Sequence, residues 1–372
     1  MINQSTGSNK LLHFNAVLIF LFLFFGVLYI CRDLLIPISF AALTAMLLLP
    51  LVNKMESFRI PRFLAILLSM LLIIVIIAFL IFLITTQILG FADDIPEYKA
   101  ALLNKLEILQ KFIHEKTKVS PEKQLDFVEE RASGLLESSG KYLKNVILQT
   151  TGTVADISLI VIFIFFFLYY KERFRIFILK ITKTEKQRQT NQILSESTKV
   201  TSRYLSGVFI VIFILAVLNS VGLLIVGMDH AIFFGTLAAF LNIIPYIGVL
   251  IGAAIPVLLA LIVGDGVGMA IAVAAVFSIN QFLENNFLTP NIVGSQVKLN
   301  PLSTIIALLI GGSLWGVAGM IIFLPFLGVL KIVFDHVESL HPYGYLIGDD
   351  NENNGPTFIQ KIKSKFKKKK KG

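Results

Sequence analysis

Two apolar stretches of the sequence, 229–263 and 301–337, are too long for one membrane crossing, and each is interrupted near its middle. As one helix at roughly 1.5 Å per residue, about 35 residues would measure about 50 Å, whereas a hydrocarbon core is about 30 Å thick. The sequence NIIPYIG (242–248) breaks the first stretch, and GGSLWG (311–316) breaks the second. Each is therefore predicted to form a re-entrant hairpin of two short helices.

The remaining sequence also has the composition of a membrane protein. Only 15% of its 372 residues are charged and 56% are hydrophobic, against about 25% charged in an ordinary soluble domain. We therefore predict an all-α polytopic membrane protein with about six full transmembrane helices and two broken-helix hairpins. The candidate full spans are 11–31, 33–52, 62–89, 150–170, 207–227 and 266–285.

The basic residues predict the orientation, because loops rich in Lys and Arg stay in the cytoplasm. Segment 171–206 carries nine Lys and Arg against three Glu, and the tail 361–371 carries eight Lys. These segments and the basic loop 53–62 fall on one side if both termini are cytoplasmic and each hairpin returns to the side that it left. Segment 91–149, with nine basic and ten acidic residues, then lies outside.

This topology uses one unit twice, upside down. Residues 207–263 form a span followed by a hairpin from outside, and 266–337 form a span followed by a hairpin from inside. Such inverted repeats with interrupted helices are typical of secondary transporters. The predicted divisions are N-terminal helices (1–90), an extracytoplasmic helical insertion (91–149), a span with a cytoplasmic amphipathic segment (150–206), an inverted-repeat transport unit (207–340) and a cytoplasmic lysine-rich tail (341–372).

The two hairpin tips are candidate parts of a transport pathway. A helix that stops inside a membrane leaves backbone groups without partners, which is tolerated only beside protein or a water-filled cavity. In the first tip, Asn242 and Tyr246 are expected to contact solute, while Pro245 and Gly248 shape the turn; the alternative is an ordinary loop between two full spans. The second tip comprises Gly311, Gly312, Trp315 and Gly316. The pairs Gly248/Gly252 and Gly312/Gly316 have the spacing of close helix contacts.

The most polar part of any predicted span is 278–286. Gln281, Glu284 and Asn285 share one helix face. A carboxylate in a membrane is costly and therefore a functional candidate, so these residues are expected to bind solute or, for Glu284, a coupling ion; a solvated helix end is the alternative reading. Asp156, in the fourth span, is a second coupling-ion candidate or an interfacial residue. Asn219 and Ser220 are read as helix–helix hydrogen bonders.

Motifs for catalysis, cofactors and metals are not found in the sequence. It contains no phosphate-binding Walker loop, and its five His residues are scattered. The single cysteine, Cys31, cannot form an internal disulfide. We therefore predict no catalytic residues, no metal and no cofactor. Beside a membrane, the lysine tail is expected to meet anionic lipid rather than nucleic acid.

Three blocks of the sequence stand out: LNIIPYIGVLIGAAIP (241–256), QFLENNFLTPNIVGSQVKLNPL (281–302) and GGSLWGVAGMIIFLP (311–325). They resemble the signature blocks of the autoinducer-2 exporter (AI-2E) family of prokaryotic membrane transporters. The resemblance places the family's P-Y-I-G turn on residues 245–248 and its polar E-N block on Glu284 and Asn285. It implies a secondary transporter in the cytoplasmic membrane that forms a homo-oligomer such as a pentamer.

Three functions are open at this point. The first is export of a small polar solute such as an autoinducer-2-like signal, because the hairpin tips carry no fixed charge. The second is exchange of sodium or lithium for protons, with Glu284 and Asp156 as titrating groups, since the resemblance implies both activities on one scaffold. The third is a non-transporting membrane scaffold that binds a partner through 91–149.

Overall fold

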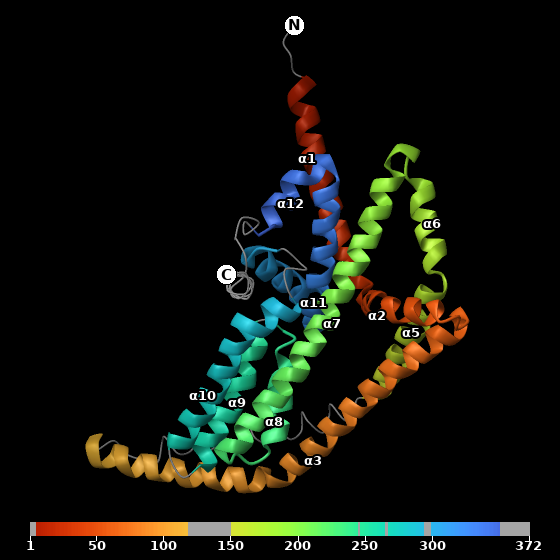
Figure 1. The fold of residues 1–372 in the computed structure, drawn as a ribbon. Coiled ribbons are helices and arrows are strands. Elements are labelled where there is room, and N and C mark those ends of the chain that lie inside the picture. Colours follow the sequence, from red (N-terminus) through yellow and green to blue (C-terminus); the bar gives the residue numbers. More distant parts are fainter. Residues whose placement is uncertain (1–4, 118–149, 245, 265–266, 294–298, 350–372) are drawn as a thin grey trace, which may run out of the picture.

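The computed structural model describes residues 5–117, 150–244, 246–264, 267–293 and 299–349 (Figure 1). Among them no strand occurs, so the predicted all-α class is confirmed; Leu299 and Gly348 form an isolated β-bridge. The helices are α1 (Ser5–Ile30), α2 (Arg32–Ser57), α3 (Arg62–Thr117), α5 (Thr150–Tyr169), α6 (Lys171–Ile181), α7 (Gln187–Val226), α8 (Ala231–Leu241), α9 (Ile247–Val263), α10 (Val267–Leu283), a π-helix (Glu284–Val293), α11 (Pro301–His336) and α12 (His341–Ile347).

Five helical segments of the described chain are long and apolar enough to cross a membrane. They are Arg32–Ser57, Arg62–Phe79, Thr184–Val226, Val267–Val293 and Pro301–His336. Shorter apolar helices occupy Phe14–Ile30, Ile157–Tyr169, Ala231–Leu241 and Ile247–Val263. The prediction of a polytopic membrane protein is confirmed.

Helix α11 is long enough for one crossing but turns back on itself. Gly316 has φ 61° and ψ −142°, a backbone conformation outside the helix. The rings of Trp315 and Phe323 lie 5.5 Å apart, although residues eight apart in a straight helix are separated by about 12 Å. The backbones of Gly311 and Gly319 touch, with no room for a Cβ on either. Two helical arms therefore cross at these two glycines, as expected for the second hairpin.

Helices α8 and α9 form the first hairpin, and residues 242–244 and Tyr246 are the described residues between them. Tyr246 stands just before α9 with φ 66° and ψ −56°. Gly248 packs against the backbone of Leu241, and Gly252 packs against Ala238. The predicted close contact through Gly248 and Gly252 is therefore present.

The corresponding prediction for Gly312 and Gly316 needs correction. Gly316 supplies the left-handed turn and has open space beside it, and Gly312 faces the side chain of Met320. Close approach depends instead on Gly311 and Gly319, because the chain reverses between them. The spacing of a glycine pair along a helix does not predict contacts across a break in that helix.

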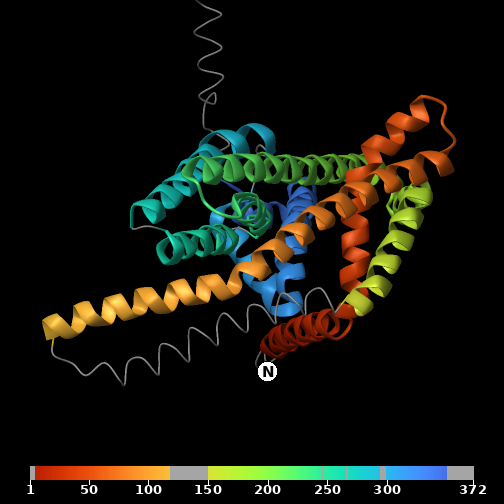
Figure 2. The same cartoon turned by 90° about the horizontal axis from the view of Figure 1, so that it is seen from below.

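Helix α3 is continuous over 56 residues, so it passes through the predicted boundary at residue 90. Figures 1 and 2 show it running from the N-terminal helices past the ends of α8 and α9. The predicted insertion 91–149 thus begins inside this helix, and its part 118–149 lies outside the described residues. In the same way, α7 joins the amphipathic segment before residue 207 to the fifth span without a break.

The second half of α3 is docked on the C-terminal helices by polar and aromatic contacts. His230 Nε2 lies 2.7 Å from Asp94 Oδ2, and the rings of Phe91 and Phe233 stack at 5.3 Å. Lys105 Nζ donates to the carbonyl oxygens of Leu261 at 2.8 Å and Gly264 at 2.6 Å. These contacts hold α3 on the loops that begin α8 and end α9.

Four apolar clusters form the core of the described residues, and the two largest lie on different parts of the molecule. One joins α2, α3 and α5, and includes Ala41, Val52, Ala65, Ile66 and Leu168. The other joins α7 to α10, and includes Leu223, Phe233, Phe234, Ala260 and Val273. In Figures 1 and 2, α2, α5 and α6 lie beside one end of α7, and α8 to α10 lie beside the other end. Helix α7 is therefore the element that both halves share.

Candidate functional site

The turn of the first hairpin meets the polar end of α10. Asn242 Nδ2 donates to Glu284 Oε1 at 2.8 Å, and Gln281 Nε2 donates to Glu284 Oε2 at 2.9 Å. Gln281 Nε2 also donates to Asn285 Oδ1 at 3.1 Å. The fold thus brings together four of the residues that the sequence selected, although Asn242 and Glu284 are 42 positions apart.

Glu284 is buried, with 8% of its surface exposed. Burying a charged or polar group is costly unless hydrogen bonds replace those to water, and here each carboxylate oxygen accepts one amide N–H. Among the described residues, Glu284 forms no ion pair with Lys or Arg. The alternative reading of Glu284 as a solvated helix end does not match this burial.

Glu284 is also the first residue of the π-helix Glu284–Val293. Wide turns of this kind are rare and often occur at functional sites. Pro290 lies inside the segment and lacks a backbone N–H. The side-chain amides of Asn286 and Asn291 each donate to the carbonyl oxygen four residues earlier, at 2.9 Å and 2.6 Å. These amides give the wide turn additional hydrogen bonds that a regular helix does not require.

A second pair of amides lies deeper, between α7 and α10. Asn280 Nδ2 donates to Asn219 Oδ1 at 2.8 Å, and both side chains are buried. The sequence predicted Asn219 as a helix–helix hydrogen bonder, and this contact is of that kind. Asn280 was missed as an individual residue, although it stands within the polar stretch 278–286.

A cavity of about 500 Å³ opens between α7, α8, α9 and α10 beside these amides. Four amide side chains line it, together with Ser278 and small or apolar residues. The amides are Asn219, Asn242, Asn280 and Gln281, and the other lining residues include Ala238, Ala253, Ala254, Val257, Ala274 and Phe277. No charged side chain of the described chain lines this cavity, so Glu284 lies behind its amide partners.

The other predicted site residues lie away from the cavity. Tyr246 is 59% exposed and does not line it. Pro245 and the side chain of Asp156 lie outside the described residues. The residues of the second tip pack elsewhere: Trp315 donates its indole N–H to the carbonyl oxygen of Leu28 in α1 at 2.9 Å. The cavity is therefore bounded by the first hairpin and two spans, and not by two hairpin tips.

Comparison with known proteins agrees with this architecture. The model of the AI-2E family transporters matches residues 18–339. YueF of Bacillus subtilis, named as a candidate transport protein, is 27% identical over 332 residues, which cover 86% of this chain and 88% of YueF.

Two further relatives carry names that state what they transport. The AI-2 transport protein TqsA of Escherichia coli is 23% identical over 326 residues, covering 86% of this chain and 91% of TqsA. The sodium-lithium/proton antiporter of Halobacillus andaensis is 26% identical over 305 residues, covering 77% of this chain and 85% of the antiporter. Because the family model covers nearly the whole chain, the protein belongs to the AI-2E family of membrane transporters.

Proposed function

We propose that this transporter exports a small, neutral, polyhydroxylated solute of the autoinducer-2 type through the cavity between α7, α8, α9 and α10. The observation that carries the proposal is the lining of that cavity: four amide side chains, one hydroxyl and apolar carbon, with no charged group among the described residues. Its volume of about 500 Å³ falls within the range of roughly 300–1,000 Å³ for small-molecule sites.

The hydrogen bonds around Glu284 favour a solute that donates. Both N–H groups of Gln281 are taken by Glu284 and Asn285, so the acceptor oxygen of this amide is left for a ligand. One N–H of Asn242 is held by Glu284 in the same way. In this proposal the buried carboxylate fixes the two amides, and their carbonyl oxygens accept hydrogen bonds from solute hydroxyl groups.

The proposed substrate class and location depend on a relative and on the charge pattern. TqsA, a relative over most of its length, is named as an AI-2 transport protein. The excess of Lys and Arg in 171–206 and in the tail supports a cytoplasmic-membrane protein with both termini in the cytoplasm.

A second candidate is exchange of sodium or lithium for protons. It is favoured by the buried Glu284, which has no basic partner among the described residues, and by the name of the Halobacillus relative. In an antiporter, this carboxylate would bind the cation and the proton in turn, with Asp156 as a further titrating group.

Reconstituted liposomes separate these functions. Flux of synthetic autoinducer-2 and cation-driven proton flux would be measured for the wild type and for Glu284→Gln. A neutral-solute exporter moves autoinducer-2 and shows no sodium- or lithium-driven proton flux in either protein. Its solute flux falls in Glu284→Gln, because the single amide oxygen can accept from only one of the two amides that the carboxylate holds. Cation-driven proton flux that Glu284→Gln abolishes would establish the antiporter instead. Absence of both fluxes would indicate a scaffold.

A further inference from the structure

A larger cleft lies beside the N-terminal half of α7, away from the proposed solute cavity, which lies beside its C-terminal half. It has a volume of about 1300 Å³ and separates α2, α5 and α6 from α7. None of the four amides of the solute cavity lines it. In Figure 1 this is the side of α7 that faces α2, α5 and α6.

The cleft changes from cationic to apolar along α7. Lys199, Arg203 and Ile210 all line it, and their spacing of four and seven residues keeps them near one helix face. The distance from Lys199 to Ile210 along the helix is about 16 Å at roughly 1.5 Å per residue. The two basic residues precede the predicted span that starts at 207, and Ile210 lies within it. The charged part thus lies at the membrane boundary and the apolar part lies within the hydrocarbon region.

The opposite wall has the same polarity. Lys171 and Arg175 of α6 line the cleft beyond the predicted span 150–170, whereas Ala42 and Met46 of α2 and Phe167 of α5 line it within predicted spans. Four basic side chains and one carboxylate, Glu172, line the cleft. Its charge is therefore positive at one end only.

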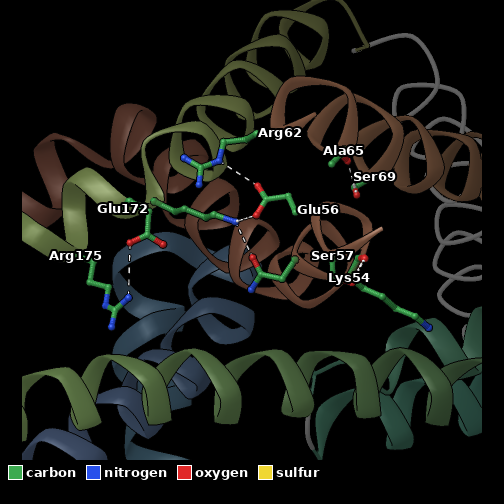
Figure 3. A network of polar contacts seen from close by, with 10 residues as sticks. Lys54, Glu56, Ser57, Arg62, Ala65, Ser69, Glu172 and Arg175 are labelled. Carbon is green, nitrogen blue, oxygen red and sulfur yellow. Dashed lines mark hydrogen bonds and ion pairs between the residues drawn. The ribbon is translucent and has the colours of Figure 1, made fainter. Parts of the chain in front are cut away.

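The two basic residues of α6 that line the cleft, Lys171 and Arg175, already have partners within the protein. Lys171 Nζ lies 2.9 Å from Glu56 Oε2 and donates to Asn53 Oδ1 at 2.6 Å. Figure 3 shows Glu56 also paired with Arg62, and Arg175 paired with Glu172. The charges of Lys171 and Arg175 are thus compensated by neighbouring carboxylates.

The basic residues of α7 differ in this respect. Lys199 and Arg203 are exposed and form no ion pair with any residue that the structure describes. They lie one helical turn apart and point along the same wall of the cleft as the apolar Ile210. Lys199 and Arg203, without ion-pair partners and next to the apolar part of the cleft, are complementary to a molecule with an anionic headgroup and a hydrocarbon chain.

We propose that this cleft binds an anionic phospholipid, with its headgroup phosphate against Lys199 and Arg203 and an acyl chain against Ala42, Met46, Phe167 and Ile210. Arg and Lys form charge-assisted hydrogen bonds with phosphate, and basic pockets between helices on the cytoplasmic side of membrane proteins bind anionic headgroups. The apolar wall distinguishes a lipid from a soluble phosphate, which would gain nothing from it. The bound lipid fills the space between the N-terminal helices and α7.

Native mass spectrometry tests this assignment on the purified full chain offered equal amounts of phosphatidylglycerol and phosphatidylcholine. The wild type is expected to retain phosphatidylglycerol in preference, on the order of tenfold. The double variant Lys199→Gln/Arg203→Gln should lose that preference, while Lys183→Gln/Arg188→Gln should keep it. The control variant also removes one exposed Lys and one exposed Arg from the basic segment 171–206, but neither residue lines the cleft.

Two further measurements identify the ligand as a lipid. Ala42→Phe leaves all charges in place and fills the apolar slot, so it should also reduce phosphatidylglycerol retention. Water-soluble glycerophosphoglycerol, which has the headgroup without chains, should not compete. Equal retention of both lipids by the wild type, or unchanged preference in Lys199→Gln/Arg203→Gln, would overturn the proposal. A change in oligomeric state in that variant, with lipid preference intact, would assign the cleft to a second copy of the chain.

Discussion

The two hairpins solve the same structural problem with different chemistry. Both reverse an apolar helix at a residue with positive φ, Tyr246 in the first and Gly316 in the second, and both cross their arms at glycines. The first turn carries Asn242, which bonds to Glu284 beside a cavity. The turn of the second carries Trp315, which bonds to a backbone oxygen of α1. Glycines therefore determine the hairpin shape, and the polar residue at the turn determines whether the hairpin contributes to a site or to packing.

The largest effect is expected from adding a methyl group at either crossing. Gly319→Ala and Gly248→Ala each place a Cβ against backbone atoms, and backbone cannot yield as a flexible side chain does. We expect a loss of about 3 kcal/mol of stability, the upper end of the usual overpacking range, seen as a lower melting temperature in detergent. Gly268→Ala, which has open space beside it, is the control. Equal melting temperatures for all three variants would contradict the close crossings.

The second largest effect is expected from removing the polar side chain of the first hairpin turn, which is proposed to serve transport. Asn242→Ala leaves Glu284 Oε1 without its donor, which should destabilise the protein by about 2 kcal/mol and reduce solute flux in liposomes by about tenfold or more. Asn291→Ala removes an exposed amide that bonds only to a backbone carbonyl, and it should retain flux. If both variants transport equally, Asn242 is not part of the pathway.

Trp315→Phe is expected to act on stability alone. It removes the hydrogen bond to Leu28 and keeps an aromatic ring beside Phe323. The expected cost is about 1 kcal/mol, measured by thermal denaturation, with solute flux per folded molecule unchanged. A loss of flux as large as that of Asn242→Ala would show that the second turn also serves transport.

The smallest effect concerns the support that the first hairpin receives from α3. Lys105→Met removes two hydrogen bonds to backbone carbonyls of 261 and 264 and keeps an unbranched side chain of similar length. Because the ammonium group is near the surface, we expect a loss of only about 0.5–1 kcal/mol. Faster hydrogen exchange in 258–263, without change in the second hairpin, is the measurement that checks it. Equal protection in the variant would show that this contact contributes nothing.

Much of the fold could be predicted from local pattern. Apolar run length fixed the membrane class, and helix breakers within two overlong runs located both turns. Helical spacing placed Gln281, Glu284 and Asn285 on one face, which is the face that contacts Asn242. The partner across the site could not be derived in this way, because a contact between residues 42 apart depends on how α8 and α10 pack.

Two features escaped prediction for identifiable physical reasons. Acidic residues after an apolar run, such as Asp94 and Glu97, signal the end of a membrane span but not the end of a helix, and contacts with α8 and α9 continue α3 beyond them. The π-helix after Leu283 has no periodicity of its own over ten residues. The local signal was the combination of Pro290 with Asn286 and Asn291, whose side chains supply extra donors.

The continuity of α3 has a mechanical consequence. Proline is absent between Arg62 and Phe91, and the one proline of α3, Pro96, lies between the attachment points at Asp94 and Lys105. The part between the core contacts with α2 and α5 and the attachment at Phe91 is therefore a stiff rod whose far end is fixed to the first hairpin. If the first hairpin moves, this part of α3 must tilt as one body about the connection between α2 and α3. The range of movement of the hairpin is therefore limited by how far α3 can rotate at that distant connection.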